Sequence, residues 1–132
     1  MMQPSDYIGL DIGEKRTGIA RASTIAKLAE PLKIVPTEEL MPELAKIIQA
    51  GPIAGIVVGL PRSLNGDDTA QTKWVLDWAK RAQEDIDLPF FFQDEALTTK
   101  QAEAESRQSL HLDDRAASII LQDFLDSNEA GE

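Results

Sequence analysis

Acidic residues stand at three points of the chain where buried structure is expected to begin or end. Asp11 closes an apolar run, Glu95 follows a phenylalanine-rich run, and Asp113 opens an apolar helical pattern. Three carboxylates about 5 Å apart would repel one another by roughly 3 kcal/mol per pair at an effective dielectric constant near 20. Binding a hard divalent cation through oxygen removes that cost, so the trio indicates a metal site.

Such a site has a defined chemistry. Two divalent ions about 3.5–4 Å apart can activate a water molecule and stabilise the leaving oxygen of a phosphodiester. No cysteine or histidine is needed, which suits a chain without cysteine and with a single histidine. The sequence therefore predicts Asp11, Glu95 and Asp113 as catalytic and metal-binding residues for Mg²⁺ or Mn²⁺.

Each acid also has a simpler local interpretation. Asp11 could only form the turn that follows it, because aspartate is common in turns. Asp94 and Glu95 could be ordinary loop acids, and either Asp113 or Asp114 could cap the last helix. The metal site depends on the three acids meeting in space.

A few basic residues are placed where they could contact a charged substrate. Lys15 and Arg16 follow Asp11 in a predicted hairpin, Arg62 follows a predicted strand, and Lys100 lies in a later polar segment. Lysine and arginine in such positions can hold phosphate groups and so orient a nucleic acid. These four residues are predicted to bind substrate; the alternative for each is a solvated surface charge.

Hydrophobic periodicity predicts the elements that position these residues. Strands are expected over residues 7–11, 17–22, 31–35, 55–60 and 89–92, and helices over 37–50, over 69–84, from Thr98 and after Asp114. Thr37 is expected to cap the first helix. Trp74, Trp78 and the run Phe90–Phe92 are expected to be core and not a base-stacking surface.

The order of these elements predicts an α/β fold. Three strands come first, then helix–strand, helix–strand and two closing helices. Right-handed crossovers through the helices make the later strands parallel, while the opening hairpin is antiparallel. Ligands gather outside the carboxyl ends of parallel strands. Asp11 and Glu95 would therefore point to one region of a mixed five-stranded sheet, and the last helix can bring Asp113 beside them.

Composition limits the classes of protein. A chain of 132 residues makes about one domain (1–132), with a tail from Asn128 expected to fray. The absence of cysteine excludes disulfides, thiolate zinc sites and a cysteine nucleophile. The formal charge of −10 has the wrong sign for coating nucleic acid by bulk charge. No apolar run reaches the roughly 20 residues of a membrane helix, and no secretion signal is evident, so we expect a soluble, cytoplasmic protein.

Four motifs, taken together, resemble those of one family. The stretch Gly9–Ala20 resembles the opening strand and hairpin of the YqgF/RuvX family of RNase H-like nucleases. Val58–Pro61 is similar to that family's second signature, Asp94–Thr99 to its third and Asp113–Gln122 to its fourth. The four segments occur in family order along nearly the whole chain.

The resemblance implies an RNase H-like fold and a metal-dependent nuclease that processes the 5′ end of the 16S rRNA precursor. It assigns Asp11 as the first-strand acid, Glu95 as the second acid and Asp113 as the acid that opens the last helix, with the neighbouring Asp114 as the alternative third acid. Ala96 stands where the family usually has arginine, and Arg107 is the lone base in a segment that often carries lysines. These departures concern substrate affinity more than the carboxylate trio.

Three functions follow as expectations. The first is hydrolysis of an rRNA precursor, and the second is resolution of Holliday junctions in DNA, which shares the same chemistry. The third is a non-catalytic module that binds RNA or the transcription machinery, which the acidity of the chain favours. A nucleic-acid partner, no membrane, and a monomer or homodimer are expected. Resolution of a symmetric junction requires two active sites, and hence a dimer.

Overall fold

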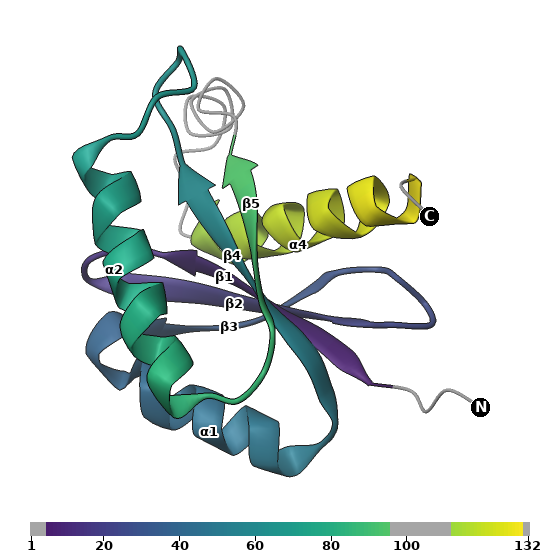
Figure 1. Ribbon diagram of the computed structural model, residues 1–132. Coiled ribbons are helices and arrows are strands. Elements are labelled where there is room, and N and C mark those ends of the chain that lie inside the picture. The colour runs from purple at the N-terminus through teal and green to yellow at the C-terminus, as the bar shows by residue number, and fades with distance from the viewer. Residues whose placement is uncertain (1–4, 96–111, 131–132) are drawn as a thin grey trace.

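The computed structural model describes residues 5–95 and 112–130, with the side chains of the last helix described over residues 115–127. In chain order the elements are β1 (Asp6–Ile12), β2 (Arg16–Ser23), β3 (Glu30–Pro36), a 3₁₀ turn η1 (Thr37–Glu39), α1 (Leu40–Ala50), β4 (Ile53–Pro61), α2 (Ala70–Asp85), β5 (Phe90–Glu95) and α4 (Leu112–Ala130). Figure 1 shows their arrangement.

The strands form one five-stranded sheet in the order β3-β2-β1-β4-β5. β1 pairs antiparallel with β2, and β2 with β3, whereas β1–β4 and β4–β5 are parallel. The predicted mixed sheet is confirmed. Because β1, β4 and β5 run in the same direction, their carboxyl ends share one edge of the sheet.

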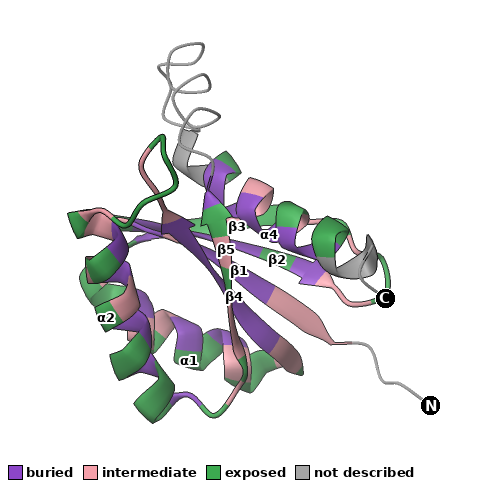
Figure 2. Cartoon of the chain, turned by 45° about the horizontal axis from the view of Figure 1, so that its top comes forward, coloured by how far each residue is buried: buried purple, intermediate pink, exposed green. Residues whose placement is uncertain are grey.

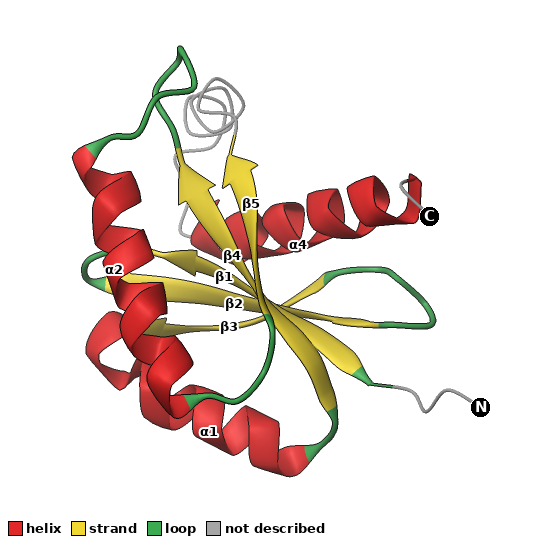
Figure 3. Ribbon diagram, in the orientation of Figure 1, coloured by secondary structure: helices red, strands yellow, loops and turns green. Residues whose placement is uncertain are grey.

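Helices cover both faces of the sheet: α1 and α2 lie on one face and α4 on the other (Figure 3). The inward sides of the elements are buried on both faces (Figure 2). The core on the α1 and α2 side includes Ile8, Leu10, Leu44, Ile56, Val58, Val75 and Trp78. The core under α4 includes Ala20, Val57, Ala117, Ile120, Leu121 and Phe124.

Alternation along the strands decides which residues face which helix, since successive strand side chains point to opposite faces. In β1, Ile8 and Leu10 enter the core beneath α1 and α2, and Tyr7 packs under α4. Gly9 lets α4 approach closely, because a Cβ there would lie 2.7 Å from Leu121 Cβ. The residues of β1 in the same alternation as Gly9, including Asp11, therefore lie on the α4 face.

The start of α2 follows the prediction. Thr69 is its N-cap: the Thr69 hydroxyl accepts a hydrogen bond from the Thr72 amide (3.2 Å), and Thr72 Oγ1 accepts one from the Thr69 amide (2.9 Å). The Thr72 hydroxyl also donates to the Pro61 carbonyl. These contacts anchor the helix to the end of β4.

The predicted cap of the first helix is wrong. Thr37 begins η1, α1 starts at Leu40, and the Thr37 side chain makes no capping hydrogen bond. Its hydroxyl instead donates to the Gly13 carbonyl (2.7 Å), and it lies 2.9 Å from the hydroxyl of the buried Thr17. The non-local partners at the β1–β2 turn have displaced the local capping role.

Smaller differences occur elsewhere. Trp78 is buried and Trp74 packs against the core as expected, but the Phe92 side chain is exposed. α4 extends to Ala130, and the predicted fraying of the tail from Asn128 stays a prediction. The helix predicted from Thr98 lies outside the described residues. None of the helices in the described part of the chain is long and apolar enough to cross a membrane.

Candidate active site

Two of the three predicted acids lie on the same edge and the same face of the sheet. Asp11 is half-buried near the end of β1, and Glu95 is the last residue of β5, with 8% of its surface exposed. The register pairs Leu10 with Val58 and Gly59 with Gln93, so Asp11 stands beside Gly59 and Glu95 slightly beyond. Both strand ends therefore lie at the same edge of the sheet, and the catalytic and metal-binding roles of the two acids stay predictions.

The Glu95 carboxylate folds back over β4 on the side of α4. An ideal Cβ on Gly59 would lie 2.7 Å from Glu95 Oε2 and 3.1 Å from its Cδ, and 2.5 Å from Ile120 Cδ1 of α4. The carboxylate thus lies between the central strand and the helix, shielded from water. Its Oε1 atom is buried and accepts no hydrogen bond within the described residues, although Glu95 does interact with other groups.

Asp113 lies in the first turn of α4. It precedes Ala117 and Ile120 by one and two helical turns, and those two residues pack on the sheet. Figure 1 shows the N-terminal end of α4 near the arrowheads of β1, β4 and β5. The side chains of Asp113 and Asp114 lie outside the described residues, and the described part alone contains no cluster of three or more metal-ligating side chains. The third ligand therefore stays a prediction.

The residues present suit a hard divalent cation. The donors at this edge are carboxylate oxygens, which Mg²⁺ and Mn²⁺ prefer over nitrogen or sulfur. A buried carboxylate beside a second acid carries desolvation and repulsion costs that a cation offsets. Asp11 and Glu95 could hold such an ion, with Asp113 as the predicted third ligand.

Of the predicted basic residues, Lys15 lies in the turn between β1 and β2, and Arg16 is the first residue of β2. The turn is tied down by backbone bonds from Gly13 N to Arg16 O (3.0 Å) and from Thr37 N to Lys15 O (2.9 Å). Both basic side chains are exposed, and within the described residues neither takes part in an ion pair. They are available to an anionic ligand.

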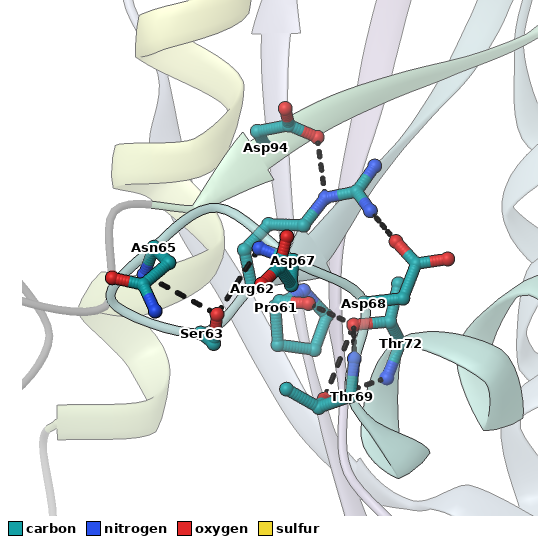
Figure 4. Close-up of polar contacts among 9 residues, drawn as sticks. All are labelled: Pro61, Arg62, Ser63, Asn65, Asp67, Asp68, Thr69, Thr72 and Asp94. Carbon is teal, nitrogen blue, oxygen red and sulfur yellow. Dashed lines mark hydrogen bonds and ion pairs between the residues drawn. The ribbon is translucent and has the colours of Figure 1, made fainter.

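Arg62 lies in the loop after β4 and has two acidic partners (Figure 4). Its Nε donates to Asp94 Oδ1 (3.1 Å) and its Nη1 to Asp68 Oδ1. The Ser63 hydroxyl accepts hydrogen bonds from the Asn65 and Asp67 amides and so shapes the loop. The predicted substrate role of Arg62 is untested, as is that of Lys100, which lies outside the described residues.

Two acids outside the predicted site have pKa values displaced from the ordinary range. A hydrogen bond from Lys33 lowers the pKa of Glu43 in α1. Burial, and then the nearby charge of Asp126, raise the pKa of Asp123 in α4. Neither acid is among the predicted site residues.

Sequence reasoning missed the contribution of Gly59 to this site, noting it only within a motif. The available signal was a glycine inside an otherwise apolar strand, which often marks a place where another group approaches closely.

Comparison with known proteins places the chain in a family. Residues 5–127 match the RuvX family model, described as Holliday junction resolvase. A protein of Roseiflexus sp. (strain RS-1) named "Putative pre-16S rRNA nuclease" is 38% identical, with 95% of this chain and 96% of the relative covered. A protein of the same name from Streptococcus mutans is 33% identical, with 90% and 96% covered.

Solved structures support the fold. Thermus thermophilus RuvC, in complex with a Holliday junction substrate, has a TM-score of 0.56 and 16% identity, covering 95% of this chain and 96% of RuvC. The Fowlpox virus resolvase, in complex with Holliday junction DNA, has a TM-score of 0.54 and 12% identity, covering 92% and 97%. The predicted RNase H-like fold is confirmed by these likenesses. The chain belongs to the RuvX family, whose relatives carry nuclease and resolvase names.

Proposed function

We propose that this protein is a metal-dependent nuclease that hydrolyses phosphodiester bonds of an rRNA precursor, at the 5′ end of 16S rRNA. The observation that carries the proposal is the placement of Asp11 and Glu95 on one face of one sheet edge, with the Glu95 carboxylate over the strand between them. The names of the relatives support the choice of substrate.

The roles of the residues follow from their places. Asp11, Glu95 and Asp113 would hold Mg²⁺ or Mn²⁺, which when bound supplies activation of water and stabilisation of the leaving oxygen. The Glu95 carboxylate lies in a buried position beside Ile120, which limits the access of bulk water to it. Lys15 and Arg16 would bind a substrate phosphate next to Asp11.

The test is cleavage of a 16S precursor fragment by the full chain, with Mn²⁺ and with a chelator. We expect cleavage only with metal, and Asp11→Asn and Glu95→Gln should each slow it by at least about 100-fold, which corresponds to about 2.7 kcal/mol of lost transition-state stabilisation. Asp67→Asn, which changes an exposed acid of the loop after β4, is the matched control and should cut at the wild-type rate. Wild-type cleavage by the Asp11→Asn protein would refute the proposal.

Metal binding is tested separately by calorimetric titration of the wild-type chain with Mn²⁺. Saturable binding below about 10 mM is expected for carboxylate ligands of this kind. Its absence would favour a non-catalytic module that binds RNA or a protein of the transcription machinery.

A second candidate, resolution of DNA junctions, is favoured by the description of the family model and the likeness to RuvC. Both substrates would use the same acids. A four-way DNA junction in the same assay, with the oligomeric state measured by sedimentation, separates the two. Symmetric cleavage by a dimer would favour the resolvase, whereas a monomer that cuts RNA alone would favour the rRNA precursor.

A further inference from the structure

Gly59 is not required by its backbone conformation. It lies within β4, paired with Gln93 of β5, and its φ lies outside the left-handed range that favours glycine. Val58 and Leu60 flank it, and Ile56 and Val57 precede them, as is typical of a central strand. The reason for a glycine must therefore lie in what surrounds it.

The space where a Gly59 side chain would stand is filled by the Glu95 carboxylate and the Ile120 methyl group. Oε2 of Glu95 lies 2.7 Å from the ideal Cβ position and Ile120 Cδ1 lies 2.5 Å from it. Both distances are shorter than real Cβ contacts. A side chain at this position would have to displace the carboxylate, the methyl group or both.

The position over Gly59 brings the Glu95 carboxylate closer to Asp11. Neighbouring strands lie about 4.8 Å apart, so the backbones of β1 and β5 are about 10 Å apart across β4. A carboxylate lying over Gly59 is only about one strand spacing from Asp11, which stands beside Gly59 in β1. At that separation one cation, or a close pair, can reach both acids.

We propose that Gly59 is a positioning residue, whose missing side chain lets the Glu95 carboxylate lie over β4 and share a divalent cation with Asp11. The inference rests on the nuclease function proposed above and adds a residue that acts through Glu95 and not on the substrate. The same strand supplies a matched control in Gly55, whose Cβ would lie 2.8 Å from the Phe91 ring and 3.2 Å from the Pro89 carbonyl. Gly55 is similarly crowded, but the atoms nearest to its Cβ position belong to Phe91 and Pro89 and include no carboxylate.

The experiment measures Mn²⁺ affinity by calorimetry and thermal stability for Gly59→Ala and Gly55→Ala in the full chain. Both substitutions should lower Tm, because both crowd the core. Only Gly59→Ala should weaken Mn²⁺ binding, by at least about tenfold, the usual size of effect for residues that orient metal ligands. Equal Mn²⁺ affinity in the two variants would overturn the inference.

Ile120→Val separates metal binding from packing, since it removes the Cδ1 methyl group nearest the Gly59 Cβ position. Gly59→Ala/Ile120→Val should recover stability but keep the weak Mn²⁺ binding. Recovery of both would show that Gly59 acts through core packing and would contradict the proposal. The double variant also serves if Gly59→Ala does not fold.

Glu95→Gln distinguishes the failure of this inference from the failure of the proposed function. It should weaken Mn²⁺ binding, and adding Gly59→Ala should weaken it little further, because both changes act on one ligand. If Glu95→Gln weakens binding and Gly59→Ala does not, only the role of Gly59 fails. If Glu95→Gln changes nothing, the metal site and the role of Gly59 both fail.

Discussion

Two loops leave the carboxyl edge of the sheet, and they differ in whether their basic residues are paired with acids. The β1–β2 turn and the first residue of β2 present Lys15 and Arg16 to solvent, and neither makes an ion pair with a described residue. The loop from β4 to α2 directs the Arg62 guanidinium at two carboxylates, and only 22% of that side chain is exposed (Figure 4). The basic side chains of the first loop are available to an anionic ligand, whereas the basic side chain of the second is neutralised by acids of the same protein.

This difference matters because the chain as a whole carries a formal charge of −10. Attraction of a polyanion must then come from a local field and not from net charge. The exposed side chains of Lys15 and Arg16 can provide one at this edge. A basic residue in a loop near acids is therefore no evidence of a substrate contact until its partners are known.

The largest effect on RNA affinity is expected from Lys15→Ala/Arg16→Ala. Loss of two phosphate contacts to single-stranded RNA should weaken binding roughly 25-fold at about 0.1 M salt, since each contact contributes a salt slope of about 0.7. Anisotropy of a labelled precursor RNA measures this, in an Asp11→Asn background that prevents cleavage. The matched control is Lys80→Ala/Arg81→Ala, an exposed basic pair on α2. Equal losses in the two double variants would mean that net charge alone controls binding.

A smaller effect, of opposite sign, is expected from Asp68→Asn/Asp94→Asn. Removal of both carboxylates releases the Arg62 guanidinium, and one new phosphate contact should tighten RNA binding by about fivefold at about 0.1 M salt. The same anisotropy titration measures it. The triple variant, with Arg62→Ala added, identifies the cause. If RNA binding is still tighter without Arg62, the gain comes from the general loss of negative charge. The difference proposed between the two loops would then be wrong.

Much of the fold could be predicted from local patterns. The continuous apolar run of β4 and the helical stripe around Trp78 each follow from a single hydrophobic period. Thr37 was mispredicted because the residues around it resemble the start of a helix. Its hydroxyl instead donates a hydrogen bond to the carbonyl of Gly13, which is far from it in sequence. Since that carbonyl belongs to a distant turn, no local rule could favour it.

The site was predictable to the extent that topology determines it. Parallel strands bring Asp11 and Glu95 to one edge, and that rule needs only the order of elements. The close approach of Glu95 to Gly59 and the acidic partners of Arg62 depend on side-chain positions in the folded chain. The prediction that Arg62 binds substrate followed from its position after a strand. The sequence did not indicate that Arg62 pairs with Asp68 and Asp94 in the folded chain.

The smallest effect is expected from Arg62→Ala, although the sequence alone ranks Arg62 with Lys15 and Arg16. Because the Arg62 charge is already balanced by two carboxylates, RNA affinity should change less than about twofold. This is well below the roughly fivefold change expected for the loss of one phosphate contact. Stability should fall by at most about 1 kcal/mol per ion pair, since the Asp68 and Asp94 side chains are 47% and 68% exposed and their attraction is screened by water. Urea denaturation and the anisotropy titration measure the two quantities on one preparation. A loss of RNA affinity as large as that of the Lys15/Arg16 variant would instead make Arg62 a substrate contact, with its acidic partners exchanged for phosphate on binding.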